Sequence, residues 1–163
     1  MMTHDKIYDL AAQVVAELIR TGKTLATAES CTGGLIAARI TDVPGCSAVF
    51  LGGCVTYTND IKQRLLGVRA EAIAAYTEVS AQVACEMARG ARERLGSDLA
   101  VSATGFAGPG GGTLENPAGT VYIAVSTAGG EESWRLAFGD IGREAVRDGV
   151  VEVVLEKVLE KLV

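Results

Sequence analysis

Apolar residues recur every three to four positions near both ends of the chain. The first run extends from about 7 to 20, and its apolar face comprises Ile7, Leu10, Ala11, Val14, Val15, Leu18 and Ile19. The second extends from 143 to 162, with Val146, Val150, Val153, Val154, Val158 and Leu162 on one side. This period is typical of helices that pack one face on a core, and Gly22 supplies a stop signal for the first. We therefore predict a packed helix at each end.

Short β-compatible runs lie between these helices. They cover 24–28, 48–51 with 54–57, 99–103, 120–125 and 133–138. Gly52 and Gly53 interrupt the second run, which predicts a bulge or a close backbone approach within one strand. The last two runs are separated by 128–131 and predict a β-hairpin.

Further helices are predicted between the strands. They cover 35–40, a short segment after residue 58 that carries Lys62 and is capped by Asn59 or Asp60, 70–76, and a segment capped by Ser80 that ends near 95–96. Helices thus alternate with strands early in the chain, and a hairpin follows late. This order predicts an α/β fold, a three-layer α/β/α sandwich with a mixed central sheet.

Length and charge narrow the function classes. The chain has 163 residues, of which 48% are hydrophobic, so we expect one domain over 1–163 with a sizeable core. The formal charge of −5 argues against a nucleic-acid partner. No apolar run reaches the roughly 20 residues that span a bilayer, and residues 1–6 lack a signal-peptide pattern. We expect a cytoplasmic protein without a membrane partner.

The segment 27–34, Thr-Ala-Glu-Ser-Cys-Thr-Gly-Gly, places Ser30 between a strand and a glycine-opened helix. Gly33 and Gly34 would let a ligand approach the backbone closely, and unpaired N–H groups of the helix could face an anion or oxyanion. The simpler interpretation is that Ser30 or Thr32 caps the helix, and the octapeptide alone favours capping.

His4 is the only histidine, and we expect it to lie in a mobile N-terminus. A Ser-His-Asp or Cys-His arrangement is therefore nearly excluded, and a Ser30 nucleophile would need a lysine, tyrosinate or carboxylate as its base. Tyr57 and Lys62 offer one, since a strand end and the first turn of the next helix can point to the same sheet edge. A basic lysine requires a lowered pKa, whereas Lys62 taken alone is more often a surface charge.

Two further features could hold a ligand. Residues 104–113, closed by 116–120, form a glycine-rich loop that is not a Walker A loop and is either a wide connection or a ligand-binding rim. Arg143 and Arg147 lie one helical turn apart and either clamp a phosphate or are exposed.

Metal binding has little support. Cys31, Cys46, Cys54 and Cys85 show no C-x-x-C spacing, and the acidic residues are scattered. We expect no metal and four reduced thiols.

Three segments together, 27–34, 55–62 and 104–112, resemble the C-terminal domain of the competence/damage-inducible CinA proteins, which also occurs alone as nicotinamide-nucleotide amidase. The similarity spans nearly the whole chain. It implies hydrolysis of nicotinamide mononucleotide to nicotinate mononucleotide and ammonia in pyridine nucleotide recycling, without a cofactor or metal. By motif position, Ser30 is the nucleophile, and Tyr57 and Lys62 are its activating pair. The substrate-binding residues that we expect are Cys31, Thr32, Gly33, Gly34, Asn59, Thr104, Gly105, Gly108, Gly110, Gly111 and Arg143.

On this hypothesis Ser30 attacks the carboxamide carbon while neutral Lys62, assisted by Tyr57, accepts the proton. Backbone N–H groups of 31–34 would stabilise the oxyanion, and capping would fall to Thr32 or the backbone.

The chain departs from the family pattern at Asn116, at Phe106, within 77–80, where the family commonly reads Gly-Ala-Val-Ser, and within 139–143. The departures around Asn116 and Arg143 keep open a catalytically silent nucleotide-binding or regulatory module. An amidase for another small amide is a second alternative. The apolar helices leave room for a homo-oligomer.

Overall fold

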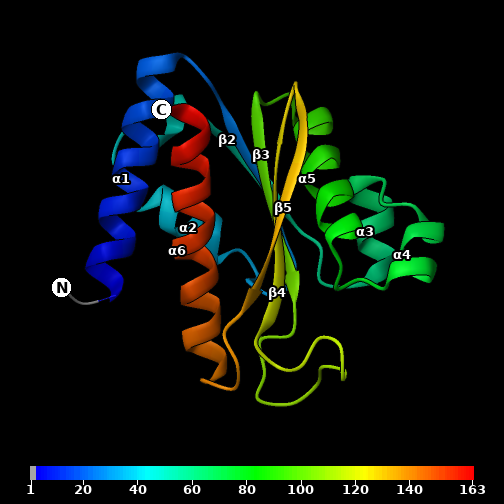
Figure 1. Cartoon of the computed structure of the whole chain (residues 1–163). Helices are drawn as coiled ribbons and strands as arrows, with labels where there is room; N and C mark the ends of the chain where they lie inside the picture. The colour runs from blue at the N-terminus through cyan, green and yellow to red at the C-terminus, as the bar shows by residue number, and fades with distance from the viewer. Residues whose placement is uncertain (1–2) are drawn as a thin grey trace.

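The computed structural model describes residues 3–163 and shows one five-stranded sheet with helices on both faces (Figure 1). The helices are α1 (Thr3–Thr21), α2 (Leu35–Thr41), α3 (Asn59–Leu66), α4 (Ala70–Tyr76), α5 (Ala81–Leu95) and α6 (Arg143–Leu162), with a 3-10 turn over Cys46–Ala48. The strands are β1 (Leu25–Glu29), β2 (Phe50–Val55), β3 (Leu99–Gly105), β4 (Thr120–Thr127) and β5 (Gly130–Ala137). The predicted α/β/α sandwich is confirmed. No helix within these residues is long and apolar enough to cross a bilayer.

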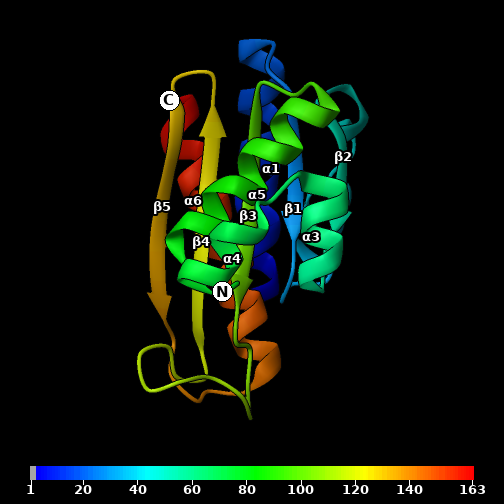
Figure 2. The same cartoon turned by 90° about the vertical axis from the view of Figure 1, so that its right-hand side faces the viewer.

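The sheet is mixed, with the order β2-β1-β3-β4-β5. β1 runs parallel to β2 and β3, whereas β4 is antiparallel to β3 and β5. The view in Figure 2 shows β4 and β5 side by side as a hairpin, as the sequence predicted. All five residues of β1 are buried, because helices cover both faces of this interior strand.

Helices α1, α2 and α6 cover one face of the sheet, and α3, α4 and α5 cover the other (Figure 1). The terminal helices contribute the apolar faces that the sequence predicted, with Val14, Leu18, Val150 and Val154 almost entirely buried in the larger core. Burial of each such side chain stabilises the fold by about 1.5–3 kcal/mol. Ile19 is the exception, since 52% of it is exposed.

The two predicted halves of the second strand form one strand, which starts later and ends earlier than expected. Residues 46–48 form a 3-10 helix, so β2 starts only at Phe50, and it ends at Val55. Its register with β1 shifts between Leu25 and Ala26, so a bulge is present. A Cβ at Gly53 would lie 2.0 Å from Thr27 Oγ1, so the predicted close backbone approach is also present.

Two predictions about helix starts were wrong. Thr58, not Asn59 or Asp60, caps α3, because Thr58 is the last residue with extended backbone and its Oγ1 accepts the Ile61 N–H at 3.3 Å. His4 lies in α1 rather than in a mobile end, since the helix extends to Thr3. The predicted Ser80 cap of α5 is confirmed, and its Oγ accepts the Val83 N–H at 3.2 Å.

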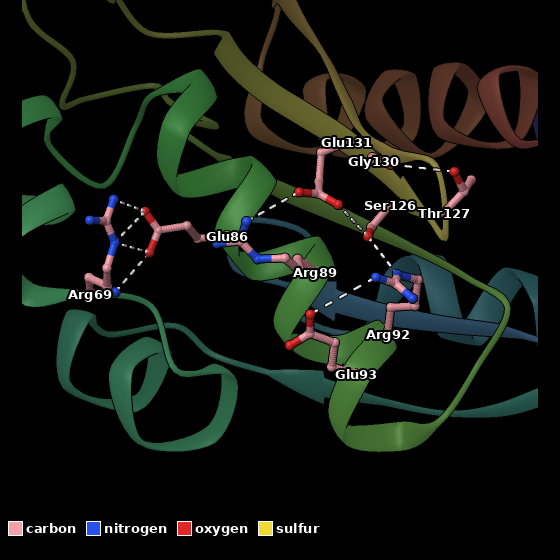
Figure 3. Close-up of polar contacts among 9 residues, drawn as sticks. All are labelled: Arg69, Glu86, Arg89, Arg92, Glu93, Ser126, Thr127, Gly130 and Glu131. Carbon is pink, nitrogen blue, oxygen red and sulfur yellow. Dashed lines mark hydrogen bonds and ion pairs between the residues drawn. The ribbon is translucent and has the colours of Figure 1, made fainter.

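Polar contacts fasten α5 to its neighbours (Figure 3). Arg92 Nε donates to Ser126 Oγ at 2.9 Å, and Ser126 Oγ donates to Glu131 Oε2 at 2.9 Å, which links the helix to both strands of the hairpin. At the other end, the Arg69 guanidinium and backbone N–H both donate to the Glu86 carboxylate. These bonds hold α5, and with it the segment that precedes it, against the sheet.

The carboxyl ends of β1, β2 and β3 surround one crevice, because residues at or after the end of each strand line it. β1 connects to β2 through α2 on one face, whereas β2 connects to β3 through α3, α4 and α5 on the other face. The chain therefore leaves the carboxyl ends of β1 and β2 toward opposite faces of the sheet. Such a topological switch point is where open α/β sheets bind ligands.

Candidate active site

Ser30 lies directly after β1, at the mouth of this crevice. Its backbone N–H donates to the Ala103 carbonyl of β3 at 3.0 Å, and 8% of the residue is exposed. Residues 31–34 form a turn, and α2 begins only at Leu35. Gly33 and Gly34 have φ values of 59° and 102°, which favour glycine. The glycines therefore shape a turn that presents Ser30, rather than the first turn of the helix.

Glu29 caps α2. Its carboxylate accepts the Ile36 N–H at 2.8 Å and the Ala37 N–H at 3.0 Å. The expectation that Ser30 or Thr32 caps this helix was wrong, because the buried carboxylate beneath the helix reaches both N–H groups, and Thr32 Oγ1 is buried without a hydrogen-bond partner among the described residues. These N–H groups of α2 are thus already used and do not face an anion.

Lys62 is buried beside Ser30. It projects from α3 with 1% of its surface exposed, and its Nζ donates to Ser30 Oγ at 3.1 Å. Burial lowers the pKa of Lys62, because desolvation disfavours the ammonium form, while the charge of Glu78 and, to a smaller extent, Cys31 act in the opposite direction. Lys62 is therefore not a surface charge. At a given pH, a larger fraction of its amine is neutral than for a lysine in water.

Tyr57 and Arg143 meet at the edge of the same site. Arg143 Nη2 donates to the Tyr57 hydroxyl at 2.8 Å, and Arg143 Nη1 donates to the Gly108 carbonyl at 3.0 Å. Tyr57 is 56% exposed. Arg147, one turn further along α6, donates to the Thr32 carbonyl at 2.8 Å. Arg143 therefore reaches the site, whereas Arg147 holds the turn behind Ser30 and the two do not form a clamp.

A cavity of about 370 Å³ joins these groups. It is lined by Ser30, Cys31, Tyr57, Thr58, Asn59, Lys62, Glu78, Val79, Thr104, Gly105, Phe106, Ala107, Gly108, Gly110 and Arg143. Of the expected substrate-binding residues, Thr32, Gly33, Gly34 and Gly111 do not line it. The hydroxyl of Thr104 donates to the Glu78 carbonyl at 2.7 Å, so it is already engaged.

Sequence reasoning missed Thr58, Glu78, Val79, Phe106 and Ala107 among the lining residues, and Glu78 is the one of these that carries a charge. It lies between α4 and α5, far along the chain from both Ser30 and the glycine loop. The only signal was the departure from the family pattern within 77–80. That departure identified the segment but not its position, because its place over the end of β3 depends on the Thr104 hydrogen bond.

Cys31 also lines the cavity but is a poor nucleophile. Burial raises the pKa of its thiol to about 11, an effect that Arg147 and Lys62 only partly offset. A thiolate is the reactive form of cysteine. Ser30 therefore remains the better candidate.

No metal centre is evident within residues 3–163, where no three His, Cys, Asp or Glu side chains gather in a way that could hold an ion. His4 lines a separate cavity, together with Arg39 and Arg147, and not the one with Ser30. The arrangement around Ser30 is thus that of a serine and a lysine without histidine.

Known proteins share the sequence pattern and the fold of this chain. The model of the CinA C-terminal domain matches residues 7–162. A CinA-like protein of Parasynechococcus marenigrum is 49% identical over 94% of this chain, and one of Geobacter sp. is 58% identical over 82%. The chain spans 37% and 32% of those two proteins, about a third of their length.

Solved structures resemble the whole chain. The competence/damage inducible protein CihA from Agrobacterium tumefaciens has a TM-score of 0.93 at 42% identity, covering 95% of this chain and 94% of that one. A CinA superfamily protein from Klebsiella pneumoniae has a TM-score of 0.92 at 37% identity, covering 99% and 98%.

Proposed function

Because the chain belongs to the family of CinA C-terminal domains, we propose that it is an amidohydrolase that converts nicotinamide mononucleotide to nicotinate mononucleotide and ammonia in pyridine nucleotide recycling. The observation that carries this proposal is the 3.1 Å hydrogen bond between two buried groups, Lys62 Nζ and Ser30 Oγ, at the wall of a ligand-sized cavity. A serine paired with a lysine of lowered pKa is a means of acyl transfer without histidine. The four free cysteines fit a reducing compartment such as the cytoplasm.

In the first half of the reaction, Ser30 Oγ attacks the carboxamide carbon while neutral Lys62 accepts the hydroxyl proton. The C–N bond of the tetrahedral intermediate then breaks, and the Lys62 ammonium returns the proton to the departing ammonia. The product of this half is an ester between Ser30 and the nicotinoyl group. The direct hydrogen bond between Lys62 and Ser30 favours Lys62 as the immediate base. Tyr57 would then affect the reaction only through its hydrogen bond with Arg143.

In the second half, Lys62 takes a proton from water as the water attacks the ester carbon. The bond to Ser30 Oγ breaks, the serine is reprotonated, and the carboxylate product leaves. Backbone N–H groups after Ser30 are suited to the oxyanion. Those of Gly33 and Leu35 donate to the carbonyls of Ser30 and Thr32, whereas those of Cys31 and Thr32 have no backbone acceptor among the described residues.

Arg143 is suited to the phosphate of the nucleotide. It is the one arginine that lines the cavity within residues 3–163, and it stands at the start of α6, where the N-cap Gly142 offers no side-chain cap. Guanidinium groups bind phosphate strongly, and a helix N-terminus favours an anion.

The test is an ammonia-release assay on nicotinamide mononucleotide with the full chain and with Ser30→Ala and Lys62→Met, which keeps the volume of the lysine stem. We expect turnover in the parent protein and a loss of at least about 10²-fold in each variant. Lys23→Met, which removes an exposed lysine, is the matched control and should keep its turnover. Near-normal turnover of either site variant would contradict the mechanism.

The same assay separates the alternatives. An amidase for another small amide would release ammonia from a panel of amides but not from this nucleotide. A silent nucleotide-binding module would show ligand-induced thermal stabilisation without ammonia.

A further inference from the structure

The segment 77–79 carries backbone strain at the wall of the cavity. Thr77 has φ 67° and ψ 167°, and it is the one non-glycine residue with a positive φ among residues 3–163. This region of backbone space is essentially restricted to glycine. Strain of this kind persists where the surroundings hold it, and it gathers at functional sites. The residue that directly follows is Glu78.

Several hydrogen bonds hold this segment in place. Thr104 Oγ1 of β3 donates to the Glu78 carbonyl at 2.7 Å, and Asn116 Nδ2 of the glycine loop donates to the Val79 carbonyl at 3.5 Å. Ser80 Oγ donates to the Thr77 carbonyl at 2.8 Å. Glu78 lies outside any helix, and the backbone around it is thus held by β3, by the glycine-rich loop and by the N-cap residue of α5.

The charge of Glu78 is unusual for its place. It is the one acidic residue that lines the cavity within the described chain, and the other charged lining residues are Lys62 and Arg143. A carboxylate near Lys62 favours the ammonium form of that lysine and so opposes the effect of burial on its pKa. In the unliganded protein Glu78 therefore works against the base. A bound ligand with a positive charge would offset the carboxylate.

The proposed substrate carries a charge that does so. In nicotinamide mononucleotide the carboxamide is attached to a pyridinium ring, which is positive because its nitrogen is bonded to ribose, and the phosphate at the other end is negative. Resting on the function proposed above, we propose that Glu78 is a specificity-determining residue that selects carboxamides carried on a cationic ring. Arg143 would take the phosphate, so the two charged ends of the ligand match the two charged walls of the cavity.

The proposal has a consequence for the base. A cationic ring between Glu78 and Lys62 offsets the carboxylate and repels the ammonium, so binding of the correct substrate favours neutral Lys62. An uncharged amide lacks this effect. Selection therefore acts on turnover as well as on affinity.

The experiment compares two ligands that differ in ring charge, nicotinamide mononucleotide and its 1,4-dihydro form, which has the same carboxamide, ribose and phosphate on a neutral ring. The ratio of kcat/KM for the two is measured in the parent protein, in Glu78→Gln and in Glu115→Gln. Glu115 is an exposed acidic residue of the neighbouring loop and lies outside the cavity, so it controls for loss of a carboxylate. The intrinsic reactivities of the two amides cancel when the ratios of the variants are compared.

We expect Glu78→Gln to lower the preference for the cationic ring by about five- to tenfold, as the loss of one partly exposed charge pair implies, while Glu115→Gln leaves it unchanged. A ratio of kcat/KM in Glu78→Gln equal to that of the parent would overturn the proposal, including the case in which kcat/KM falls equally for both ligands.

A binding measurement keeps this proposal separate from the function itself. The dissociation constants of both ligands are measured in Ser30→Ala, with and without Glu78→Gln. If the parent protein releases no ammonia but binding still loses its preference on Glu78→Gln, the amidase function falls and the charge selection stands. If neither ligand binds, the charge selection is overturned too.

Discussion

Arg143 Nη2 donates to the hydroxyl of Tyr57 at 2.8 Å, which joins the start of α6 to the segment that follows β2 across 86 positions of sequence. The same guanidinium donates to the Gly108 carbonyl of the glycine loop. Arg143 thus ties three separate parts of the cavity wall together. Tyr57 in turn fixes the position of Arg143. Within residues 3–163, Tyr57 makes no hydrogen bond to Ser30 or Lys62.

Tyr57→Phe should therefore weaken substrate binding more than it slows turnover. Loss of this hydrogen bond frees Arg143, and we expect KM for nicotinamide mononucleotide to rise roughly fivefold, equivalent to about 1 kcal/mol, with kcat within about twofold. Steady-state ammonia release checks this. Tyr76→Phe is the control, since Tyr76 is exposed and does not line the cavity. A kcat that falls by about 10² or more at constant KM would instead assign Tyr57 to proton transfer.

The sequence predicted the Ser30–Lys62 pair because both residues follow strands. Parallel neighbouring strands end at one edge of a sheet, so the residue after β1 and the first turn of the helix after β2 had to come close. The strong 3.6-residue periods at the two ends of the chain also predicted α1 and α6. The two terminal helices follow from local pattern alone, whereas the roles of Ser30 and Lys62 also came from the resemblance to the CinA family.

Glu29 and Glu78 could not be predicted in the same way. The role of Glu29 depends on a four-residue turn that delays α2, so that its carboxylate lies below the N–H groups of Ile36 and Ala37. The position of Glu78 depends on a hydrogen bond to a residue 26 positions away. Neither arrangement has a periodic signature, because both are set by where separate elements meet.

Lys62→Met should change how stability depends on pH. Burial lowers the folded-state pKa of Lys62 below its ordinary 10.5. Between these two values the unfolded chain holds a proton that the folded chain does not, so the parent gains stability as pH rises through this window. Below the folded-state pKa, Lys62 is protonated in both states, and burying its ammonium lowers the free energy of unfolding of the parent. This loss is about 1.4 kcal/mol for every unit by which folding lowers the pKa. The variant lacks this penalty, so its advantage in stability should disappear near pH 10.5.

Urea denaturation between pH 7 and pH 10.5 measures this difference. Lys23→Met again controls for the loss of an exposed lysine. A difference between parent and Lys62→Met that stays constant over this range would show that the buried amine does not titrate differently in the folded protein.

Glu29→Gln should impair both stability and turnover. A glutamine keeps one acceptor oxygen, but its amide nitrogen would face the second N–H group and leave it unpaired, at a cost of about 1–3 kcal/mol. The turn that presents Ser30 starts from this cap, so we expect kcat to fall by about tenfold or more. Urea denaturation and ammonia release measure the two effects.

The matched control for this variant is Glu86→Gln. Glu86 is also buried and accepts a backbone N–H, from Arg69, but it does not line the cavity. We expect it to lower stability without lowering kcat. Equal losses of kcat in both variants would mean that general destabilisation, and not the position of Ser30, explains the effect of Glu29→Gln.

Thr77→Gly should stabilise the protein relative to Thr77→Ala. Both variants lose the hydrogen bond from Thr77 Oγ1 to the Val79 carbonyl, but only glycine relieves the strain of φ 67°. That strain costs about 1–3 kcal/mol, and the extra freedom of glycine in the unfolded chain returns about 0.4–1 kcal/mol of it. We therefore expect the glycine variant to have a free energy of unfolding about 1 kcal/mol higher than the alanine variant in urea denaturation. Its preference between the cationic and neutral rings should stay unchanged, because hydrogen bonds from Thr104 and Asn116 hold the segment. A glycine variant that is less stable than the alanine variant would show that the surroundings of Thr77 accommodate its backbone without strain.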